Sequence, residues 1–318
     1  MNLTDRLSDM EQDTGASTSS TPAQQLAVYC IALIIFLIVF NNTMIILVVR
    51  KLEHINSISI NSAQCLQMKA LAVTDLTVGL FLLLAFVSAI FNRWIFENTM
   101  CKVMGMSLSS TLFMTFYILS FSSLDKYVLI FFPLRYSSFV TTFRTRILLV
   151  VLSVISVLLS TSLTSHVAYI PIVYVCLPPM SQSNNYLIQF ILAVILWLLP
   201  CITVSSFGYI NIFTLARKQR VQIEIQTSRE IMSPISKGRR NLISLILTTL
   251  AWIICWIPFI FLFVTSPLHS QCTHLYTVAF IAQYMVFANS FMNWFIYYST
   301  QPLFRQEQMK LFKWGLFN

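Results

Sequence analysis

The residue of this sequence with the clearest chemical potential is Asp75, a single carboxyl group in the middle of a long apolar stretch. If that stretch crosses a membrane, a charge at mid-depth is costly and requires a cation, a proton or a water-filled cavity. Asn42, Asn289, Ser290 and Asn293 are further polar groups inside apolar stretches. We expect Asp75 to bind a cation or to be protonated and hydrogen-bonded, whereas Asn42 and Asn293 could simply join neighbouring helices.

Cysteine thiols are the second group that could react. Of the seven cysteines, Cys101, Cys176 and Cys272 lie between apolar stretches, and the other four lie in or beside them, where thiols usually pack. If these three face the oxidising side of a membrane, a disulfide is expected, and the residues alone allow any of the three pairings. The sequence contains no nucleophile and base pair, metal-ligand cluster or phosphate-binding loop, so an enzyme is the least favoured class.

The composition indicates that membrane-spanning helices position these groups. The chain is 57% hydrophobic and 10% charged, with a mean hydropathy of +0.76. No charged residue occurs in Ile147–Ala216 or in Asn241–Phe304, and each run accommodates two spans of about 20 residues with a polar break. Three more spans are expected at 26–49, 70–92 and 103–132. In lipid, a helix forms all of its backbone hydrogen bonds within itself, whereas the strands of a barrel alternate apolar and polar side chains. The apolar stretches here show no such alternation. The sequence therefore favours an all-α membrane protein, a seven-transmembrane-helix bundle, over a barrel or a soluble helical core.

Charge placement orients this bundle. The net charge is +9, yet when the loops are assigned alternately to the two sides, only Arg6, Arg93 and Lys102 of the 20 basic residues lie on the outer side. Basic residues concentrate on the cytoplasmic side of membrane proteins. The bilayer therefore accounts for the positive charge, no nucleic-acid partner is expected, and the N-terminus is predicted to be extracellular.

Three segments follow from this orientation. Residues 1–25 form a polar extracellular tail in which Asn2 is a candidate glycosylation site, residues 26–299 form the membrane domain, and residues 300–318 form a cytoplasmic tail. From Pro302 onward a short amphipathic eighth helix is predicted, with a solvated tail as the alternative. Its apolar face would carry Leu303, Phe304, Leu311 and Trp314, opposite Arg305, Gln306 and Lys313.

The polar and aromatic motifs, taken in order along the spans, resemble those of the rhodopsin-like (class A) G-protein-coupled receptors. The resemblance runs from Asn42 to Phe304. Its motifs are Asn42, Leu71 to Leu76, Trp94 followed by Cys101, Asp125-Lys126-Tyr127, Pro133 to Tyr136, Pro200, Cys255-Trp256-Ile257-Pro258, and Asn293 to Tyr297.

The resemblance implies roles for particular residues. It pairs Cys101 with Cys176 and leaves Cys272 spare. It implies a sodium site at Asp75, Thr115, Asn289, Ser290 and Asn293, and no other cofactor is expected. It implies that a heterotrimeric G protein is recognised through switch residues Asp125, Lys126, Tyr127, Tyr209 and Tyr297.

The sequence also departs from the family pattern. Lys126 stands in place of an arginine, Trp294 in place of a proline, and Gly208 in place of a tyrosine, with Tyr209 next to it. A lysine can pair with Asp125 but cannot make the bidentate contacts of a guanidinium. These changes predict a weak inactive-state latch and leave open a receptor-like protein that no longer signals, acting as a decoy or a partner subunit.

The resemblance further implies a pocket for an extracellular small molecule. The amine receptors place an aspartate at the position of Leu108, which argues against a monoamine, and the last span has no lysine for retinal. An apolar wall with one amide, Gln283, favours a neutral or lipophilic ligand, although the same side chains could pack the bundle without one. The wall is predicted from Leu108, Leu112, Leu192, Leu196, Trp256, Phe259, Phe263, Gln283 and Phe287.

The leading prediction is therefore a cell-membrane receptor that changes its helix packing when a ligand binds outside and so admits a G protein inside. A transporter or channel that uses Asp75 and Asp125 as a relay is a further alternative. Transporters often contain internal repeats, and none is found in this sequence.

Overall fold

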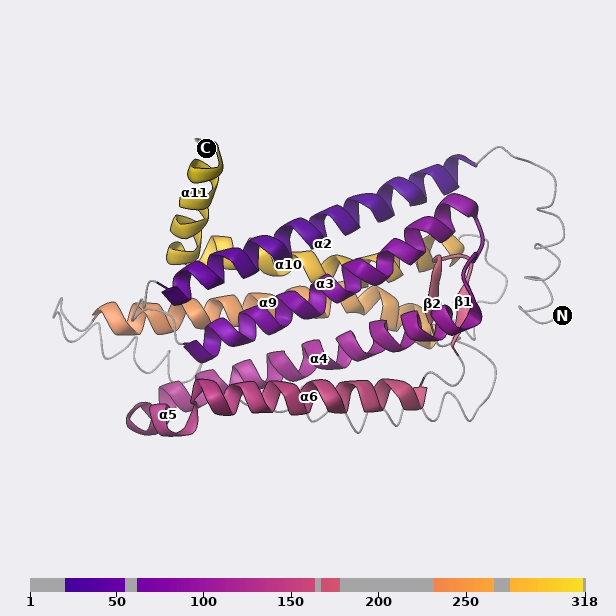
Figure 1. Cartoon of the computed structure of the whole chain (residues 1–318). Coiled ribbons are helices and arrows are strands. Elements are labelled where there is room, and N and C mark those ends of the chain that lie inside the picture. Colours follow the sequence, from indigo (N-terminus) through magenta and orange to yellow (C-terminus); the bar gives the residue numbers. More distant parts are fainter. Residues whose placement is uncertain (1–20, 55–61, 164–166, 178–231, 266–274, 317–318) are drawn as a thin grey trace.

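The computed structural model describes residues 21–54, 62–163, 167–177, 232–265 and 275–316. In these ranges long helices lie side by side as a bundle, with short elements at its two ends (Figure 1). In chain order the elements are α2 (Pro22–His54), α3 (Ser62–Phe91), α4 (Asn98–Phe131), α5 (Pro133–Phe139), α6 (Thr142–Leu163), β1 (Ala168–Ile170), β2 (Val175–Leu177), α9 (Met232–Thr265), α10 (Leu275–Thr300) and α11 (Pro302–Leu316).

The long helices lie where the spans are predicted. α2, α3, α4 and α6 are long and apolar enough to cross a bilayer, and α9 contains a shorter apolar segment, Ile246–Leu262. α2 has 33 residues and is about 50 Å long, so it extends beyond the hydrocarbon layer. α10 corresponds to the last predicted span. The predicted fifth span lies outside the described residues, as do Leu192, Leu196 and Tyr209, which it carries.

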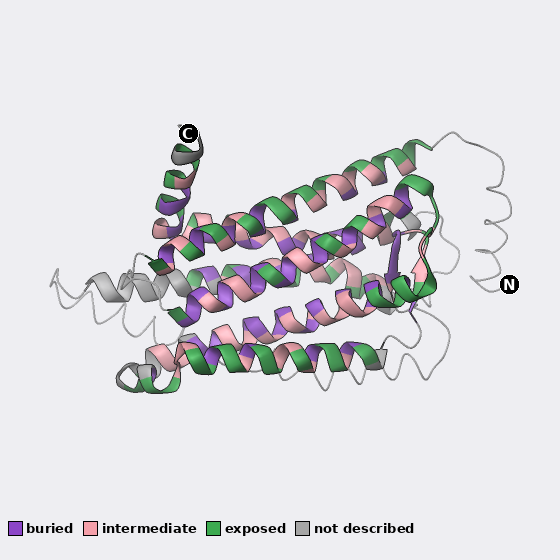
Figure 2. Ribbon diagram, in the orientation of Figure 1, coloured by how far each residue is buried: buried purple, intermediate pink, exposed green. Residues whose placement is uncertain are grey.

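The helices differ in how far they are buried (Figure 2). α6 is exposed along much of its length, with Val150 58% and Leu158 63% exposed, whereas α3 and α4 contain many buried residues. Exposed apolar side chains on a spanning helix face lipid, which is as apolar as they are. α3 and α4 therefore form the interior of the bundle, and this interior shields polar side chains such as Asp75 and Thr115.

A two-stranded hairpin covers the outer end of the bundle. β1 and β2 pair antiparallel, with Tyr169 opposite Cys176, and the Cys176 sulfur is bonded to that of Cys101 near the start of α4. This confirms the predicted pairing; Cys272 lies outside the described residues. Gly105 lies where the hairpin approaches α4, since a Cβ there would be 2.7 Å from Val167 Cγ1 and 3.2 Å from the Cys176 carbonyl oxygen. The hairpin is a β element that the all-α prediction did not include.

The opposite, inner end carries α5 and α11 (Figure 1). α11 confirms the predicted tail helix: Phe304 is fully buried, while Arg305 and Lys313 are exposed. The side chain of Trp314 lies outside the described part. An ion pair between Glu53 and Lys69, with Nζ 2.7 Å from Oε1, joins the inner end of α2 to α3.

Candidate functional site

Asp75 lies in a buried polar layer that joins α3 to α10. The Asn293 side-chain amide donates a hydrogen bond to Asp75 Oδ2 at 2.9 Å, and the Ser290 side chain is a second hydrogen-bond partner of the carboxyl group. Asp75 is 2% exposed, and Thr115 and Asn289 are 8% exposed. The five side chains predicted to hold sodium all carry oxygen, the ligand type that a small hard cation prefers, and the described contacts join three of them, Asp75, Ser290 and Asn293.

Asn42 extends this layer to α2. Its amide donates to the Ser290 carbonyl oxygen at 2.8 Å and to the Ile38 carbonyl oxygen at 2.9 Å. Trp294, which stands in place of a proline, packs against an apolar cluster shared by α2 and α3 and stacks on Tyr298 with ring centroids 5.3 Å apart. Although Trp294 stands where the family has a proline, the adjacent Asn293 still donates its hydrogen bond to Asp75. The layer therefore ties three helices together at one level.

Two predicted pocket positions, one on α4 and one on α10, lie under the hairpin. Leu108 and Phe287 are buried in one apolar cluster with Val173 and Cys176 of the hairpin segment, and Gln283 is 5% exposed. A ligand that contacts Leu108 and Phe287 would therefore lie beneath the hairpin.

Hydrogen bonds from tyrosines hold the hairpin in place. The Tyr284 hydroxyl of α10 donates to the Val173 carbonyl oxygen at 3.0 Å, and the Tyr174 hydroxyl donates to Asn92 Oδ1 at 3.4 Å. Burial raises the pKa of the Tyr174 phenol and raises that of Tyr169 well above its ordinary value, with a further contribution to Tyr169 from the neighbouring Tyr174. Both phenols therefore stay neutral at physiological pH, and Tyr174 stays a donor.

A series of aromatic side chains in contact runs from Phe259 and Trp256, two predicted pocket positions on α9, toward the inner end of the bundle, and we call it the aromatic ladder. The Trp256 ring lies 5.6 Å from Phe259 and stacks on Trp252 at 5.4 Å, and Trp252 meets Phe116 of α4 at 4.3 Å. Leu112 packs against the same cluster. The side chain of Phe263 lies outside the described residues. Sequence reasoning missed Trp252 and Phe116, although Trp252 lies one helical turn from Trp256 and so shares its face.

The inner switch motif has a partner that the sequence did not assign. The Tyr136 hydroxyl donates to Asp125 Oδ1 at 2.7 Å, and Asp125 is 1% exposed. Sequence reasoning considered Lys126 as the partner of Asp125, and the Lys126 side chain lies outside the described residues. The Tyr127 ring lies 6.3 Å from Phe132, and Tyr297 is buried on α10. In the sequence, the feature from which this contact could have been predicted is Tyr136, the tyrosine of the Pro-Leu-Arg-Tyr stretch.

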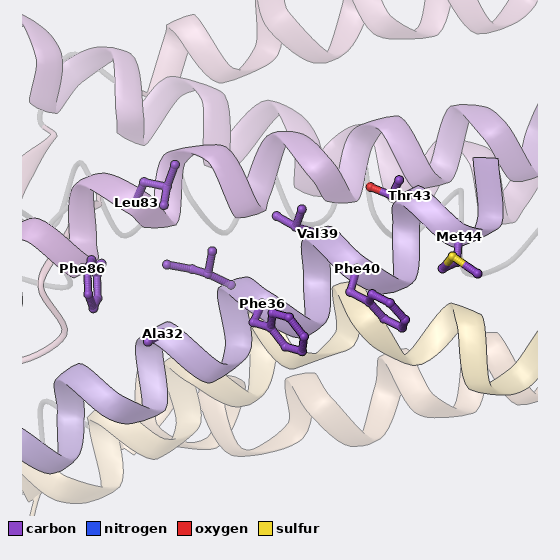
Figure 3. A pocket seen from close by; sticks show the side chains of 9 residues that line it. Ala32, Phe36, Val39, Phe40, Thr43, Met44, Leu83 and Phe86 are labelled. Atoms are coloured by element: carbon purple, nitrogen blue, oxygen red, sulfur yellow. The ribbon is translucent and has the colours of Figure 1, made fainter. Parts of the chain in front are cut away.

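An apolar groove of about 590 Å³ lies on the outside of the bundle, between α2 and α3 (Figure 3). Phe36, Phe40 and Leu83 line it, and these side chains are 63%, 39% and 45% exposed. Exposed apolar residues at this depth face lipid. The groove contains none of the predicted pocket positions and is a different surface from the predicted ligand site.

Comparison with known proteins defines the class. A sequence profile described as "7 transmembrane receptor (rhodopsin family)" matches residues 41–297, and the chain belongs to this family. Mouse G-protein coupled receptor 52 is 26% identical over 289 residues, covering 86% of this chain and 77% of that receptor. The human histamine H2 receptor is 27% identical over 315 residues, covering 92% and 81%.

A solved structure shows the same fold. The crystal structure of squid rhodopsin matches with a TM-score of 0.78 and 18% identity, and the match covers 95% of this chain and 89% of that one. Together with the family match, this confirms the seven-helix bundle with its eighth helix. The protein is therefore a multi-pass membrane receptor of the G-protein-coupled class and not an enzyme.

Proposed function

We propose that this receptor binds a neutral or lipophilic small molecule from the extracellular side and signals through a heterotrimeric G protein. The observation that carries the proposal is the outer cluster: Leu108 is 6% exposed and packs with Phe287 and the hairpin, and Gln283 is the single amide among the predicted positions. Binding pockets are mostly apolar with a few polar groups that orient the ligand. Gln283 is the group that would orient a neutral ligand here.

The histamine H2 receptor is named for an amine, and this chain is similar to it. A cationic amine in an apolar site requires a buried counter-ion, because an unpaired charge there is strongly disfavoured. None of the predicted pocket positions carries a carboxylate. A neutral ligand is therefore the better fit to this wall.

The aromatic ladder offers a route for the signal. A ligand between α4, α9 and α10 would bear on Trp256 and Phe259, and Trp256 stacks on Trp252, which meets Phe116. Packed aromatic side chains respond by discrete shifts rather than by continuous deformation. Such a shift would move the inner half of α9 relative to α4 and admit the G protein at the cytoplasmic end. The concentration of basic residues on one side supports this orientation in the cell membrane, with the N-terminus outside.

The polar layer would regulate this change. Asp75, Thr115, Asn289, Ser290 and Asn293 would hold a sodium ion, whose charge offsets that of the buried carboxylate and favours the inactive packing. Raising sodium against a large inert cation should lower basal activity or agonist affinity, and Asp75→Asn should abolish that response. A wild-type receptor indifferent to sodium would contradict the site.

The ligand proposal is tested in cells that express a panel of G proteins, with neutral lipophilic compounds and cationic amines screened side by side. We expect a neutral compound to act, and Gln283→Ala to weaken its potency about tenfold, the effect of one buried hydrogen bond. Ile257→Ala is the matched control, because Ile257 is 56% exposed to lipid on α9. Activation by an amine would overturn the ligand class. Absence of any response in both wild type and Lys126→Arg would favour the non-signalling alternative.

A further inference from the structure

The short helix α5 carries an exposed serine at the inner end of the bundle. α5 extends beyond the inner ends of α4 and α6 (Figure 1). Ser138 lies in its last turn and is exposed, and its hydroxyl donates to the Arg135 carbonyl oxygen of the same helix at 2.9 Å. Because this bond is local to α5, the hydroxyl is accessible to an enzyme that approaches from the cytoplasm.

The chain around Ser138 is basic. Residues 133–146 contain three arginines and neither Asp nor Glu. Arg135 precedes Ser138 by three residues and is exposed, and Phe139, the next residue after the serine, is 54% exposed. Protein kinases select their substrates partly by charge pattern, and a kinase whose substrate groove carries carboxylates favours basic residues beside the acceptor serine. Ser138 and its flanking residues have the charge that such a kinase recognises.

Few contacts hold α5 in its helical form. It has seven residues and no side-chain cap at its N-terminus, and helices of this length are not stable by themselves. The Tyr136 hydroxyl holds the middle of α5 by its hydrogen bond to Asp125 of α4. The Arg144 guanidinium holds the end of α5, because it donates to the Ser138 and Phe139 carbonyl oxygens. The last turn of α5 can therefore open into the extended form that a kinase binds while the bundle stays folded.

We propose that Ser138 is phosphorylated by a kinase that recognises Arg135, with ATP as the phosphoryl donor, and that the phosphate then draws the Arg144 guanidinium away from the end of α5. In the transfer, the Ser138 oxygen forms a bond to the γ-phosphorus of ATP, and the bond between that phosphorus and the β–γ bridging oxygen breaks. ADP leaves with the electron pair, and the hydroxyl proton passes to the carboxylate base of the kinase.

The phosphate would loosen the end of α5 in two ways. Pairs of arginine and phosphate are frequently bidentate and about twice as strong as neutral hydrogen bonds, so Arg144 should leave the two carbonyl oxygens for the phosphate. A negative charge at a helix C-terminus also opposes the helix dipole. Tyr136, two residues before Ser138, would then lose its position beside Asp125. The phosphorylation site stands without the proposed function, whereas an effect through Asp125 on signalling rests on that function.

An in vitro kinase reaction on the full-length receptor in lipid nanodiscs tests the site. The enzyme is the catalytic subunit of cyclic-AMP-dependent protein kinase, which selects basic residues before its serine, and a kinase that selects acidic residues is the control. We expect mass spectrometry of receptor peptides to find phosphate on Ser138 with the first kinase only, and Ser138→Ala to remove that signal. Phosphate on Ser137 instead, or on no residue of α5, would overturn the proposal.

Variants of the arginines test how the kinase recognises the site. Arg135→Ala should slow phosphorylation of Ser138 about tenfold, the effect of one charge-assisted hydrogen bond. Arg135→Lys keeps the positive charge and should restore most of the rate, which shows that the loss in Arg135→Ala is not misfolding. Arg146→Ala is the matched control, because Arg146 is an exposed arginine on α6 that follows the serine. Equal rates in Arg135→Ala and Arg146→Ala would overturn recognition through Arg135.

Hydrogen exchange of the backbone amides of α5 tests the release of Arg144. In the wild type, exchange over residues 135–140 should become several-fold faster after phosphorylation, while exchange in α11, at the same end of the bundle, should not change. In Arg144→Ala, exchange should already be fast before phosphorylation and should increase less, because the carbonyl oxygens have no guanidinium to lose. Slower exchange in the phosphorylated wild type would show that the phosphate strengthens α5, and would overturn the release.

Discussion

The two ends of this bundle are held together by different kinds of contact. At the outer end, a disulfide, a hairpin and an apolar cluster around Leu108 hold α4 and α10 together. At the inner end, the polar residues Gln67, Ser122 and Ser244 line a small cavity between the helices. Covalent and close-packed contacts resist small displacements, whereas hydrogen bonds between side chains can be exchanged for hydrogen bonds to water. From this difference we expect helix movement during signalling to occur mainly at the inner end.

Lipid explains why each end needs its own means of attachment. Apolar burial does not drive helices together in a bilayer, so close packing and hydrogen bonds must do so. Gly105 allows the hairpin to approach α4, and the pairing of Asn293 with Asp75 joins α3 to α10. Three substitutions and one change of pH, ordered from the largest expected effect to the smallest, test this contrast between the two ends.

Removal of the disulfide should have the largest effect. The bridge joins cysteines separated by 75 residues, and closure of such a loop contributes up to about 4 kcal/mol. Cys101→Ser should therefore lower the thermal unfolding temperature in nanodiscs and reduce surface expression. Cys30→Ser is the control, because Cys30 is an unbridged thiol on α2. Equal stability of the two variants would show that the outer end does not depend on its covalent link.

Gly105→Ala should destabilise the outer end by about 1–3 kcal/mol. The new methyl group would lie 2.7 Å from Val167 Cγ1 and 3.2 Å from a backbone oxygen of the hairpin. At Gly79 a methyl group would meet only side-chain atoms, the nearest being Ile38 Cγ2 at 2.9 Å, so Gly79→Ala should cost less. Thermal unfolding of the two variants measures the difference, and a larger loss for Gly79→Ala would contradict the close approach of the hairpin.

Tyr136→Phe should act at the inner end and mainly on activity. It removes the hydroxyl that donates to Asp125 and leaves a buried carboxyl group with one partner fewer, at a cost of about 1–3 kcal/mol. We expect a several-fold change in basal G-protein activation and a smaller loss of unfolding temperature than removal of the disulfide causes. Tyr29→Phe serves as the control because it removes the phenol hydroxyl of a tyrosine that is 72% exposed on α2. If Tyr136→Phe behaved like that control, the contact would have no role in the switch.

High pH should loosen the outer end slightly. The pKa of Tyr174 is raised in the folded protein from an ordinary value of 10.0 because the phenol is buried. The unfolded chain therefore ionises first, so the stabilisation is complete below pH 10 and declines as pH rises above it. Unfolding at pH 9 and pH 11 should show a loss that is smaller in Tyr174→Phe. An identical loss in the variant would assign the pH effect to other groups.

Much of the fold follows from local chemistry. The charge-free runs and the position of the basic residues predict the spans and their orientation, because the cost of a charge in lipid acts on each segment separately. α10 and α11 lie where these patterns place them. The pairing of Cys101 with Cys176 also agrees, although the residues alone left three pairings open and the family resemblance selected among them.

The sequence by itself determined which segments cross the membrane and which polar residues they carry, because hydropathy and charge are properties of the segment. Only the tertiary structure decided which side chains meet. Asp125 meets Tyr136, Trp252 meets Phe116, and Gln67 shares a cavity with Ser244, which is far away in the sequence. These contacts depend on the rotation and depth of each helix in the bundle. Helix rotation is set by packing against neighbours, and a hydropathy pattern that is apolar on nearly every face does not encode it.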